Sequence, residues 1–208
     1  YGCSRLIYIK FKECLLSIGS HTFHGCRSLQ YIYLPGSLIS IGDGTFADCY
    51  FLRDIDIAKN NTKYTYYNNA IYTKDYSTLI IVSRYNQDVY EIHEGTKVIS
   101  SFALQGCCDF VSIYIPNTVT EIHSSAFEQC SRVGTLTLPE TLHTIGDNAF
   151  SGCNRLTKIN IPEKVTSIGK NAFKDCIGIK SITIPENITE IESGTFMNCS
   201  RLTTLTIP

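Results

Sequence analysis

The chain has 208 residues, of which 43% are hydrophobic and 18% are charged, and its formal net charge is −1. These values exclude a disordered chain, and 18 Lys and Arg against 19 Asp and Glu give no basic field of the kind that nucleic-acid binders use. No apolar run approaches the roughly 18 residues that span a membrane. The unusual feature is the presence of 10 Cys and 6 Pro beside one Met and no Trp.

Proline and cysteine recur with a period of 23 residues. The last five prolines keep this spacing, at Pro116, Pro139, Pro162, Pro185 and Pro208. Seven cysteines lie 14 residues after such an anchor position, at Cys26, Cys49, Cys107, Cys130, Cys153, Cys176 and Cys199, and Cys3 lies one further period before Cys26. One period sustained along a chain is typical of a repeat protein, in which stacked units bury one another's apolar residues in a solenoid.

In chain order, the repeat occupies residues 1–57 and 93–208 and is interrupted by residues 58–92. The first segment holds half a unit and two complete units, which begin at Lys12 and Pro35. The last segment holds five units, which begin at His93, Pro116, Pro139, Pro162 and Pro185. We therefore expect two stretches of solenoid separated by an insertion of 35 residues.

Each unit predicts two local structures. Its middle, as in residues 145–153, places Ala149, Phe150 and Cys153 at spacings that favour a short helical or 3₁₀ turn. Six of seven units carry a residue suited to cap that turn, at Ser20, Asp43, Ser101, Ser124, Asp147 and Ser193. The unit closes with an alternating stretch such as residues 156–161, which predicts a short strand that the next proline ends.

The insertion, residues 58–92, holds seven of the thirteen tyrosines. Apolar residues 70–72 and 79–82 flank a turn-forming segment, which predicts a β-hairpin, and Tyr90 and Ile92 fit a strand that rejoins the repeat. One interpretation is a β-island that covers the solenoid and buries its own rings. The other is a projecting contact surface that includes Tyr64, Tyr66 and Tyr67, since tyrosine is enriched at binding hot spots.

The unit pattern P-x-x-V-x-x-I-G-x-x-A-F-x-x-C-x-x-L-x-x-I-x-I resembles the BspA-like, or treponemal-type, leucine-rich repeat. The resemblance covers all of the chain except the insertion. It implies a right-handed curved solenoid, with short parallel strands on the concave face and short helical or 3₁₀ turns on the convex side. Members of this family occur on the surfaces of oral anaerobic bacteria and mucosal protists and are implicated in adhesion to host cells, matrix proteins and other microbes.

The cysteine column allows three interpretations. We expect a dry structural column, because free cysteine behaves as a small buried hydrophobe; disulfides between coils and metal or redox use are the alternatives. Cys14, His21, His24 and Cys26 form a string that could suggest zinc, but its spacing matches no standard finger. Cys108 could meet His123 or His93 as a catalytic thiol, but no third residue is evident, so we expect no enzyme, no metal and no cofactor.

The strand pattern indicates which side chains face outward, because alternate residues of a strand point to opposite faces. The first half of the chain places aromatic and charged residues there, and the second half mostly hydroxyls. From these positions we select Tyr8, Lys10, Tyr31, Tyr33, Asp54, Asp56, Tyr114 and Lys158 as candidate partner-binding residues. The alternatives are a Thr-rich ladder that only supports strands, and a solvated acidic pair at Asp54 and Asp56.

The repeat pattern predicts an interaction protein, and the family resemblance implies a location at a cell surface or in secreted form. The resemblance also implies partners that are proteins or glycoproteins on host cells, matrix or other microbes, and we expect no nucleic acid and no membrane insertion. An intracellular scaffold is the alternative, and a cysteine-dependent enzyme is a remote one. Asn60 and Asn187 lie in sequons and are candidate glycosylation sites, whereas the sequon at Asn198 precedes a column cysteine. The chain starts within a repeat and has no polar caps, so we expect it to be part of a longer protein.

Overall fold

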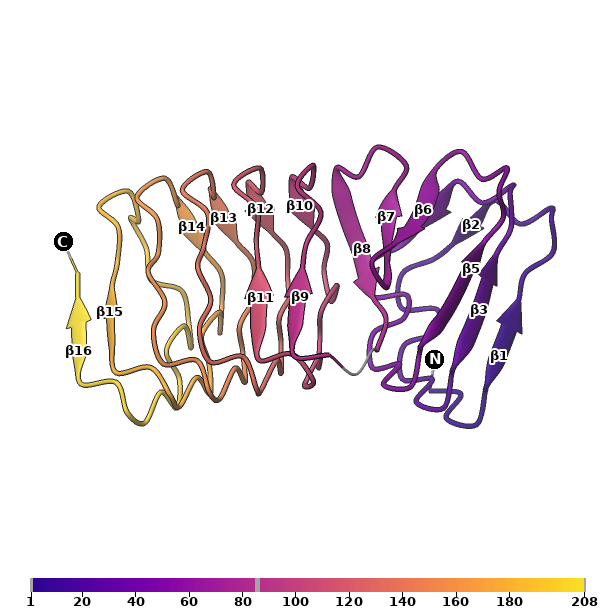
Figure 1. Ribbon diagram of the computed structural model, residues 1–208. Coiled ribbons are helices and arrows are strands. Elements are labelled where there is room, and N and C mark those ends of the chain that lie inside the picture. The colour runs from indigo at the N-terminus through magenta and orange to yellow at the C-terminus, as the bar shows by residue number, and fades with distance from the viewer. Residues whose placement is uncertain (1, 85–86, 208) are drawn as a thin grey trace. The chain divides into compact units, whose positions relative to one another are not determined.

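The computed structural model describes residues 2–84 and 87–207 (Figure 1). Two compact units divide the chain, Tyr1–Tyr85 and Asn86–Pro208. Each unit is built from coils of the repeat, and parallel pairing in both of them joins residues that lie 23 positions apart, such as Tyr8 with Tyr31 and Val98 with Glu121. The predicted β-solenoid with a 23-residue spacing is therefore confirmed.

The unit Asn86–Pro208 carries two parallel ladders that run from coil to coil (Figure 1). The strands of the longer-stranded ladder are β9 (Val89–Glu91), β11 (Ser112–Tyr114), β15 (Ser181–Thr183) and β16 (Thr204–Thr206). The second ladder joins β10 (Val98–Ile99), β12 (Glu121–Ile122), β13 (Thr144–Ile145) and β14 (Ser167–Ile168). Between β11 and β15, single bridges at Thr135 and Lys158 replace full strands.

The unit Tyr1–Tyr85 begins with two parallel ladders of its own, and strands of the insertion follow them. One ladder joins β1 (Tyr8–Lys10), β3 (Tyr31–Leu34) and β5 (Asp54–Ile57), and the other joins β2 (Ser17–Ile18) and β4 (Ser40–Ile41). The insertion forms antiparallel β6 (Tyr64–Tyr67), β7 (Ala70–Thr73) and β8 (Thr78–Val82), with a register shift between Ile71 and Tyr72. The predicted hairpin corresponds to β7 and β8, and β6 is an additional strand that the sequence analysis missed.

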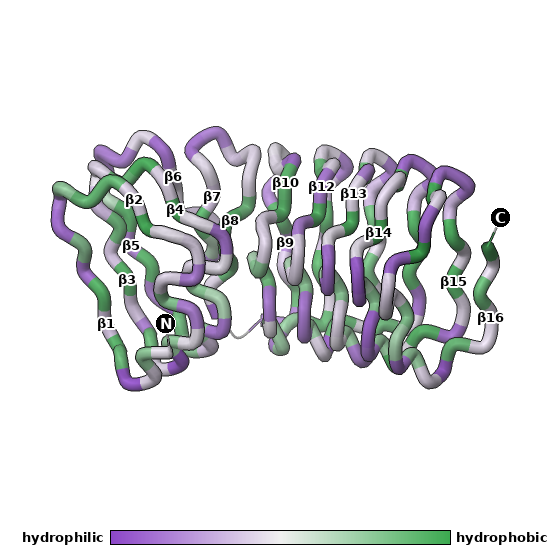
Figure 2. The backbone as a smooth tube through the Cα atoms, turned by 180° about the vertical axis from the view of Figure 1, so that it is seen from behind, coloured by the Kyte–Doolittle hydropathy of each residue, from purple (hydrophilic) through white to green (hydrophobic). Residues whose placement is uncertain are grey.

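The core consists of columns of equivalent residues from successive coils. Hydrophobic segments recur at the same place in the coils of Asn86–Pro208, as the green tube segments in Figure 2 show. The phenylalanine column stacks ring on ring, with centroids 5.2 Å apart for Phe127 and Phe150 and 5.4 Å apart for Phe150 and Phe173. Such pairs add to the free energy gained from burying each ring.

The expected helical turns are wrong, because the described residues 2–84 and 87–207 contain no helix. Left-handed backbone is the reason. Residues nine and thirteen positions after each anchor have φ between 54° and 74°: His21, Gly25, Gly44, Asp48, Phe102, Gly106, Ser125, Gln129, Asn148, Gly152, Asn171, Asp175, Gly194 and Asn198. A left-handed residue at every fourth position interrupts a right-handed helix, and Gly, Asn and Asp are the residues that adopt it at least cost.

Hydrogen bonding follows this path, because successive N–H groups alternate between the next coil and their own coil. Phe150 donates to Ala172 of the next coil at 2.8 Å, whereas Cys153 donates to Phe150 of its own coil at 3.1 Å. One of the expected cap residues bonds to the next coil: the Asp147 carboxylate accepts a 2.8 Å bond from the Lys170 backbone N–H. The turns therefore form backbone hydrogen bonds between coils, whereas a helical turn would form them only within its own coil.

Replacing Thr96 by valine is expected to raise the free energy of unfolding by about 1–2 kcal/mol. The Thr96 hydroxyl is buried with no hydrogen-bond partner, in a column where other coils carry Leu15, Leu38, Val119, Leu142, Val165 and Ile188. Urea unfolding measures the change. The matched control is Thr118→Val, because the Thr118 hydroxyl donates to the carbonyls of Glu94 and Thr96 at 2.6 and 2.7 Å and its loss should be destabilising. Equal effects of the two substitutions would contradict the assignment.

Candidate binding surface

The outward residues of β1, β3 and β5 form one exposed surface, which we call the tyrosine face: Tyr8, Lys10, Tyr31, Tyr33, Asp54 and Asp56. Their side chains point away from Ile32 and Ile55, which are buried in the core. The Tyr8 and Tyr31 rings stack with centroids 4.8 Å apart and an interplanar angle of 3°. This stack exists because equivalent residues of adjacent parallel strands lie side by side.

Carboxylates hold the Tyr31 and Tyr33 rings in place. The Tyr31 hydroxyl donates to Asp56 at 2.7 Å, and the Tyr33 hydroxyl donates to Glu13 at 2.8 Å. The bond to Asp56 raises the pKa of Tyr31 to about 12, because it favours the protonated phenol. The Lys10 ammonium lies 5.5 Å from the centre of the Tyr33 ring, within the range of a cation–π contact. The tyrosine face is therefore an ordered aromatic surface rimmed by charge.

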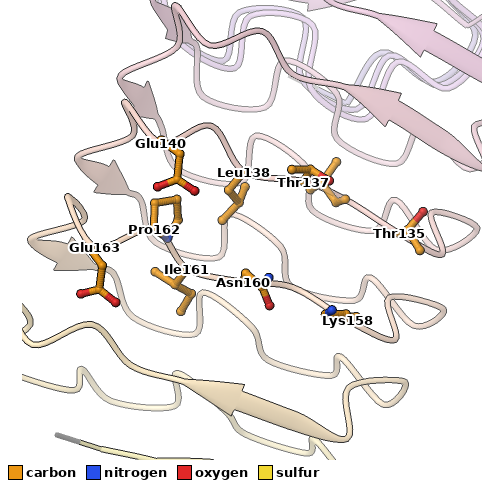
Figure 3. A pocket seen from close by; sticks show the side chains of 10 residues that line it. Thr135, Thr137, Leu138, Glu140, Lys158, Asn160, Ile161, Pro162 and Glu163 are labelled. Carbon is orange, nitrogen blue, oxygen red and sulfur yellow. The ribbon is translucent and has the colours of Figure 1, made fainter.

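Tyr114 and Lys158 lie on the corresponding ladder of Asn86–Pro208. The Tyr114 side chain is exposed on β11. Lys158 lines a hollow of about 390 Å³ over two adjacent coils (Figure 3), together with Thr135, Leu136, Thr137, Leu138, Glu140, Asn160, Ile161, Pro162 and Glu163. The sequence analysis selected Lys158 from this set and gave strand support as the alternative role of the Thr-rich positions.

The insertion tyrosines have three different environments. Tyr64, which the sequence analysis placed among the contact residues, is 6% exposed, and its hydroxyl accepts a 2.8 Å bond from the Ile41 N–H. Tyr64 is thus a packing residue, and its place in the contact set is corrected. Tyr66 is half-buried, with its hydroxyl 3.3 Å from that of Ser83. Tyr67 is exposed and packs edge-on against the buried Tyr72 ring.

Asn61 anchors the insertion to the preceding repeat, and sequence reasoning missed it. Its buried amide group donates to the carbonyls of Pro35 and Leu38 at 2.7 and 3.2 Å. Its carbonyl oxygen accepts from the N–H groups of Lys63 and Tyr64, both at 2.8 Å. The available signal was an Asn shortly before a tyrosine-rich strand, since Asn favours turns that bond to nearby backbone.

The cysteine column is mostly buried, and all ten cysteines are free thiols. Five column thiols, those of Cys49, Cys130, Cys153, Cys176 and Cys199, donate to the carbonyl of the residue eleven positions after the preceding coil's anchor. Examples are Cys153 to Phe127 at 3.2 Å and Cys176 to Phe150 at 3.1 Å. Burial raises the pKa of Cys49 and of Cys153 to about 12, so these thiols stay protonated. At the ends of the column, Cys3 is exposed and Cys199 is half-buried.

The residues considered for metal binding or catalysis include His21 and His24, whose ring centroids lie 5.5 Å apart. Among residues 2–84 and 87–207, no three His, Cys, Asp or Glu residues are grouped to hold a metal ion. His24 contacts Asp48 at 3.1 Å. The Cys108 thiol donates to the Gln129 carbonyl at 3.3 Å, whereas His123 lies 3.0 Å from Glu121 and His93 accepts from the Gly95 N–H. The Cys108 thiol is therefore bonded to a backbone carbonyl.

Both candidate glycosylation residues are exposed, yet each amide has a neighbour. The Asn187 side chain donates to the Glu163 carbonyl at 2.6 Å. The Asn60 side chain lies so close to Gly36 that a Cβ at that position would overlap it. Within the described part of the chain, no helix is long and apolar enough to cross a membrane.

Comparisons with known proteins cover almost the whole chain. The family model described as BspA type leucine rich repeat region matches residues 1–93 and 97–208 in six copies. A comparison with curated proteins finds no match.

Solved structures resemble the fold. A leucine-rich repeat protein from Eubacterium ventriosum has a TM-score of 0.84 at 20% identity over 98% of this chain, and a leucine rich cell surface protein from Faecalibacterium prausnitzii has 0.84 at 24% over 99%. The pneumococcal vaccine antigen PcpA has 0.83 at 22% over 97%. The chain spans 55%, 60% and 56% of the lengths of these three chains.

Proposed function

Because the chain belongs to the BspA-type leucine-rich-repeat family, we propose that it is a non-enzymatic module that binds protein partners through its tyrosine face. The observation that carries this proposal is the order of the exposed rings. Tyr31 is held by a stacked neighbour and by Asp56, and Tyr33 is held by Glu13. Side chains whose rotamers are already restricted lose less conformational entropy when a partner binds. Tyrosine also supplies a large contact area with few rotatable bonds.

We further propose that the module acts at a cell surface or in secreted form. Its partners would be proteins or glycoproteins on host cells, in the matrix or on other microbes. The description of the Faecalibacterium prausnitzii neighbour as a cell surface protein supports this location. Surface labelling of intact source cells tests it: labelled chain supports an external location, and chain labelled only after lysis favours an intracellular scaffold.

The double substitution Tyr31→Ala with Tyr33→Ala is expected to weaken partner binding at least tenfold while changing the melting temperature by only a few degrees. The probe is the purified, fluorescently labelled chain bound to cultured epithelial cells, with and without prior trypsin treatment of those cells. Saturable binding that trypsin removes would identify a protein partner. Both rings are partly exposed on their strand and contribute their contacts outward, so their truncation should spare the core.

The matched control is Phe51→Ala, because Phe51 is an exposed aromatic residue in the same unit but outside the tyrosine face. Phe51→Ala is expected to leave binding unchanged. Equal binding by the double variant and the unsubstituted chain would overturn the assignment of the tyrosine face, as would a parallel loss of binding and thermal stability.

A further inference from the structure

The hollow at residues 135–140 and 158–163 lies where the parallel ladder is interrupted. On either side, the ladder is formed by full strands, β9 with β11 and β15 with β16. Between them, pairing is reduced to the single bridges at Thr135 and Lys158. Ile92 and Ile184 each donate a backbone bond to the next coil, at 3.1 and 2.9 Å, and the equivalent bonds from Ile115, Leu138 and Ile161 are absent within residues 87–207. The hollow therefore coincides with the part of the ladder whose backbone is least paired.

The hollow has opposite charges at its two ends. Lys158 and Thr135 lie at one end and Glu140 and Glu163 at the other, with Thr137 and Asn160 between them (Figure 3). The two glutamates follow the anchors Pro139 and Pro162, so they occupy equivalent positions on adjacent coils. Leu138, Ile161 and Pro162 supply the apolar part of the lining. A ligand that fits must carry a cation at one end, an anion at the other and hydrogen-bonding groups between.

We infer that this hollow binds an extended peptide segment that carries a basic side chain at the Glu140 and Glu163 end and an acidic side chain at the Lys158 end. Lys158 and Glu163 are five residues apart in the sequence, so the two charges of the ligand should be separated by at most about 16 Å, or about five residues of extended peptide. The hydroxyls of Thr135 and Thr137 and the amide of Asn160 can bond to the peptide backbone between them. At about 390 Å³, the hollow has the size of ordinary ligand sites.

The lining disfavours two other classes of ligand. None of its ten residues is aromatic, so a sugar ring would find no stacking surface. Its two carboxylates would repel a phosphate backbone. Charge complementarity therefore favours the peptide, and the site is independent of the proposed function because the tyrosine face belongs to the other unit.

The test is a titration of the ¹⁵N-labelled chain with three blocked hexapeptides, followed by amide chemical shifts. Two peptides, Ac-Arg-Ala-Thr-Ala-Thr-Glu-NH₂ and Ac-Glu-Ala-Thr-Ala-Thr-Arg-NH₂, carry the paired charges in the two chain directions, and Ac-Glu-Ala-Thr-Ala-Thr-Glu-NH₂ is the control. We expect one paired-charge peptide to shift amides of residues 135–140 and 158–163 with a Kd at least tenfold lower than that of the control. Raised salt should weaken this binding.

Charge reversal identifies the contacts. Lys158→Glu alone, and Glu140→Lys with Glu163→Lys, should each weaken the preferred peptide at least tenfold. The triple reversal should instead prefer the peptide with the opposite order of charges, because both ends of the hollow have exchanged sign. All three residues are exposed, so the fold should tolerate these changes. Equal binding of all three peptides, or shifts confined to the tyrosine face, would overturn the inference without affecting the proposed function.

Discussion

Replacing Asn61 by alanine is expected to lower the free energy of unfolding by about 3–5 kcal/mol, because each unpaired buried polar group costs about 1–3 kcal/mol. The Asn61 side chain is 2% exposed and uses all of its hydrogen-bonding capacity. Its loss would remove the partners of two carbonyls in the preceding coil and of two N–H groups at the start of β6. Urea unfolding followed by circular dichroism measures the difference.

Asn60→Ala is the matched control for Asn61→Ala, because the neighbouring Asn60 is exposed and is expected to contribute less than about 0.5 kcal/mol. Asn61→Asp should be at least as destabilising as Asn61→Ala, since it keeps the acceptor for Lys63 and Tyr64 but places a buried carboxylate oxygen against the carbonyls of Pro35 and Leu38. An Asn61→Ala variant as stable as Asn60→Ala would show that the amide does not hold the insertion.

Raising the pH from 8 to 10 is expected to lower the free energy of unfolding by about 4 kcal/mol through three buried thiols, about 1.4 kcal/mol for each. Burial raises the pKa of Cys49, Cys153 and Cys176 above the ordinary thiol value of 9.0. In this pH range the folded thiols keep their protons and the unfolded thiols lose them. The folded state then binds more protons, so stability falls as pH rises above 9.0.

The alanine variant of Cys153 separates this effect from other titrations. Cys153→Ala should lower the free energy of unfolding by about 1–2 kcal/mol at pH 7, because it removes the bond to Phe127 and leaves a small cavity. Between pH 8 and 10, the free energy of unfolding of this variant should fall by about 1.4 kcal/mol less than that of the unsubstituted chain. Urea unfolding at pH 7, 8, 9 and 10 provides both values. Identical pH dependence of the two proteins would refute the contribution of this thiol.

The turn segment shows how sequence spacing predicted a position correctly and its conformation incorrectly. Ala149, Phe150 and Cys153 are all buried, as their spacing indicated. The same spacing was taken for a helical turn, but Asn148 and Gly152 adopt left-handed backbone. Gly or Asn at these two positions in several coils was the available signal, because both residues enter that region at low cost.

The candidate sites differ in how far the sequence predicted them. Strand alternation placed Tyr31 and Tyr33 outward, because side chains of a paired strand alternate between its faces. It did not predict that Glu13 would hold Tyr33, since that contact joins residues 20 positions apart on different coils. For Tyr64 the prediction was wrong. The tyrosine-rich composition of the insertion suggested an exposed contact residue, but Tyr64 is buried because of the way β6 packs.

The sequence by itself determined the period, the β-solenoid and the inward-facing columns, because a unit that cannot bury its own apolar residues must stack on identical neighbours. Only the tertiary structure decided the path of the turns, the anchoring of the insertion by Asn61 and the hollow between Lys158 and Glu163. These features depend on hydrogen bonds and distances between residues of different coils. A periodic sequence pattern does not indicate where the backbone pairing between coils is interrupted.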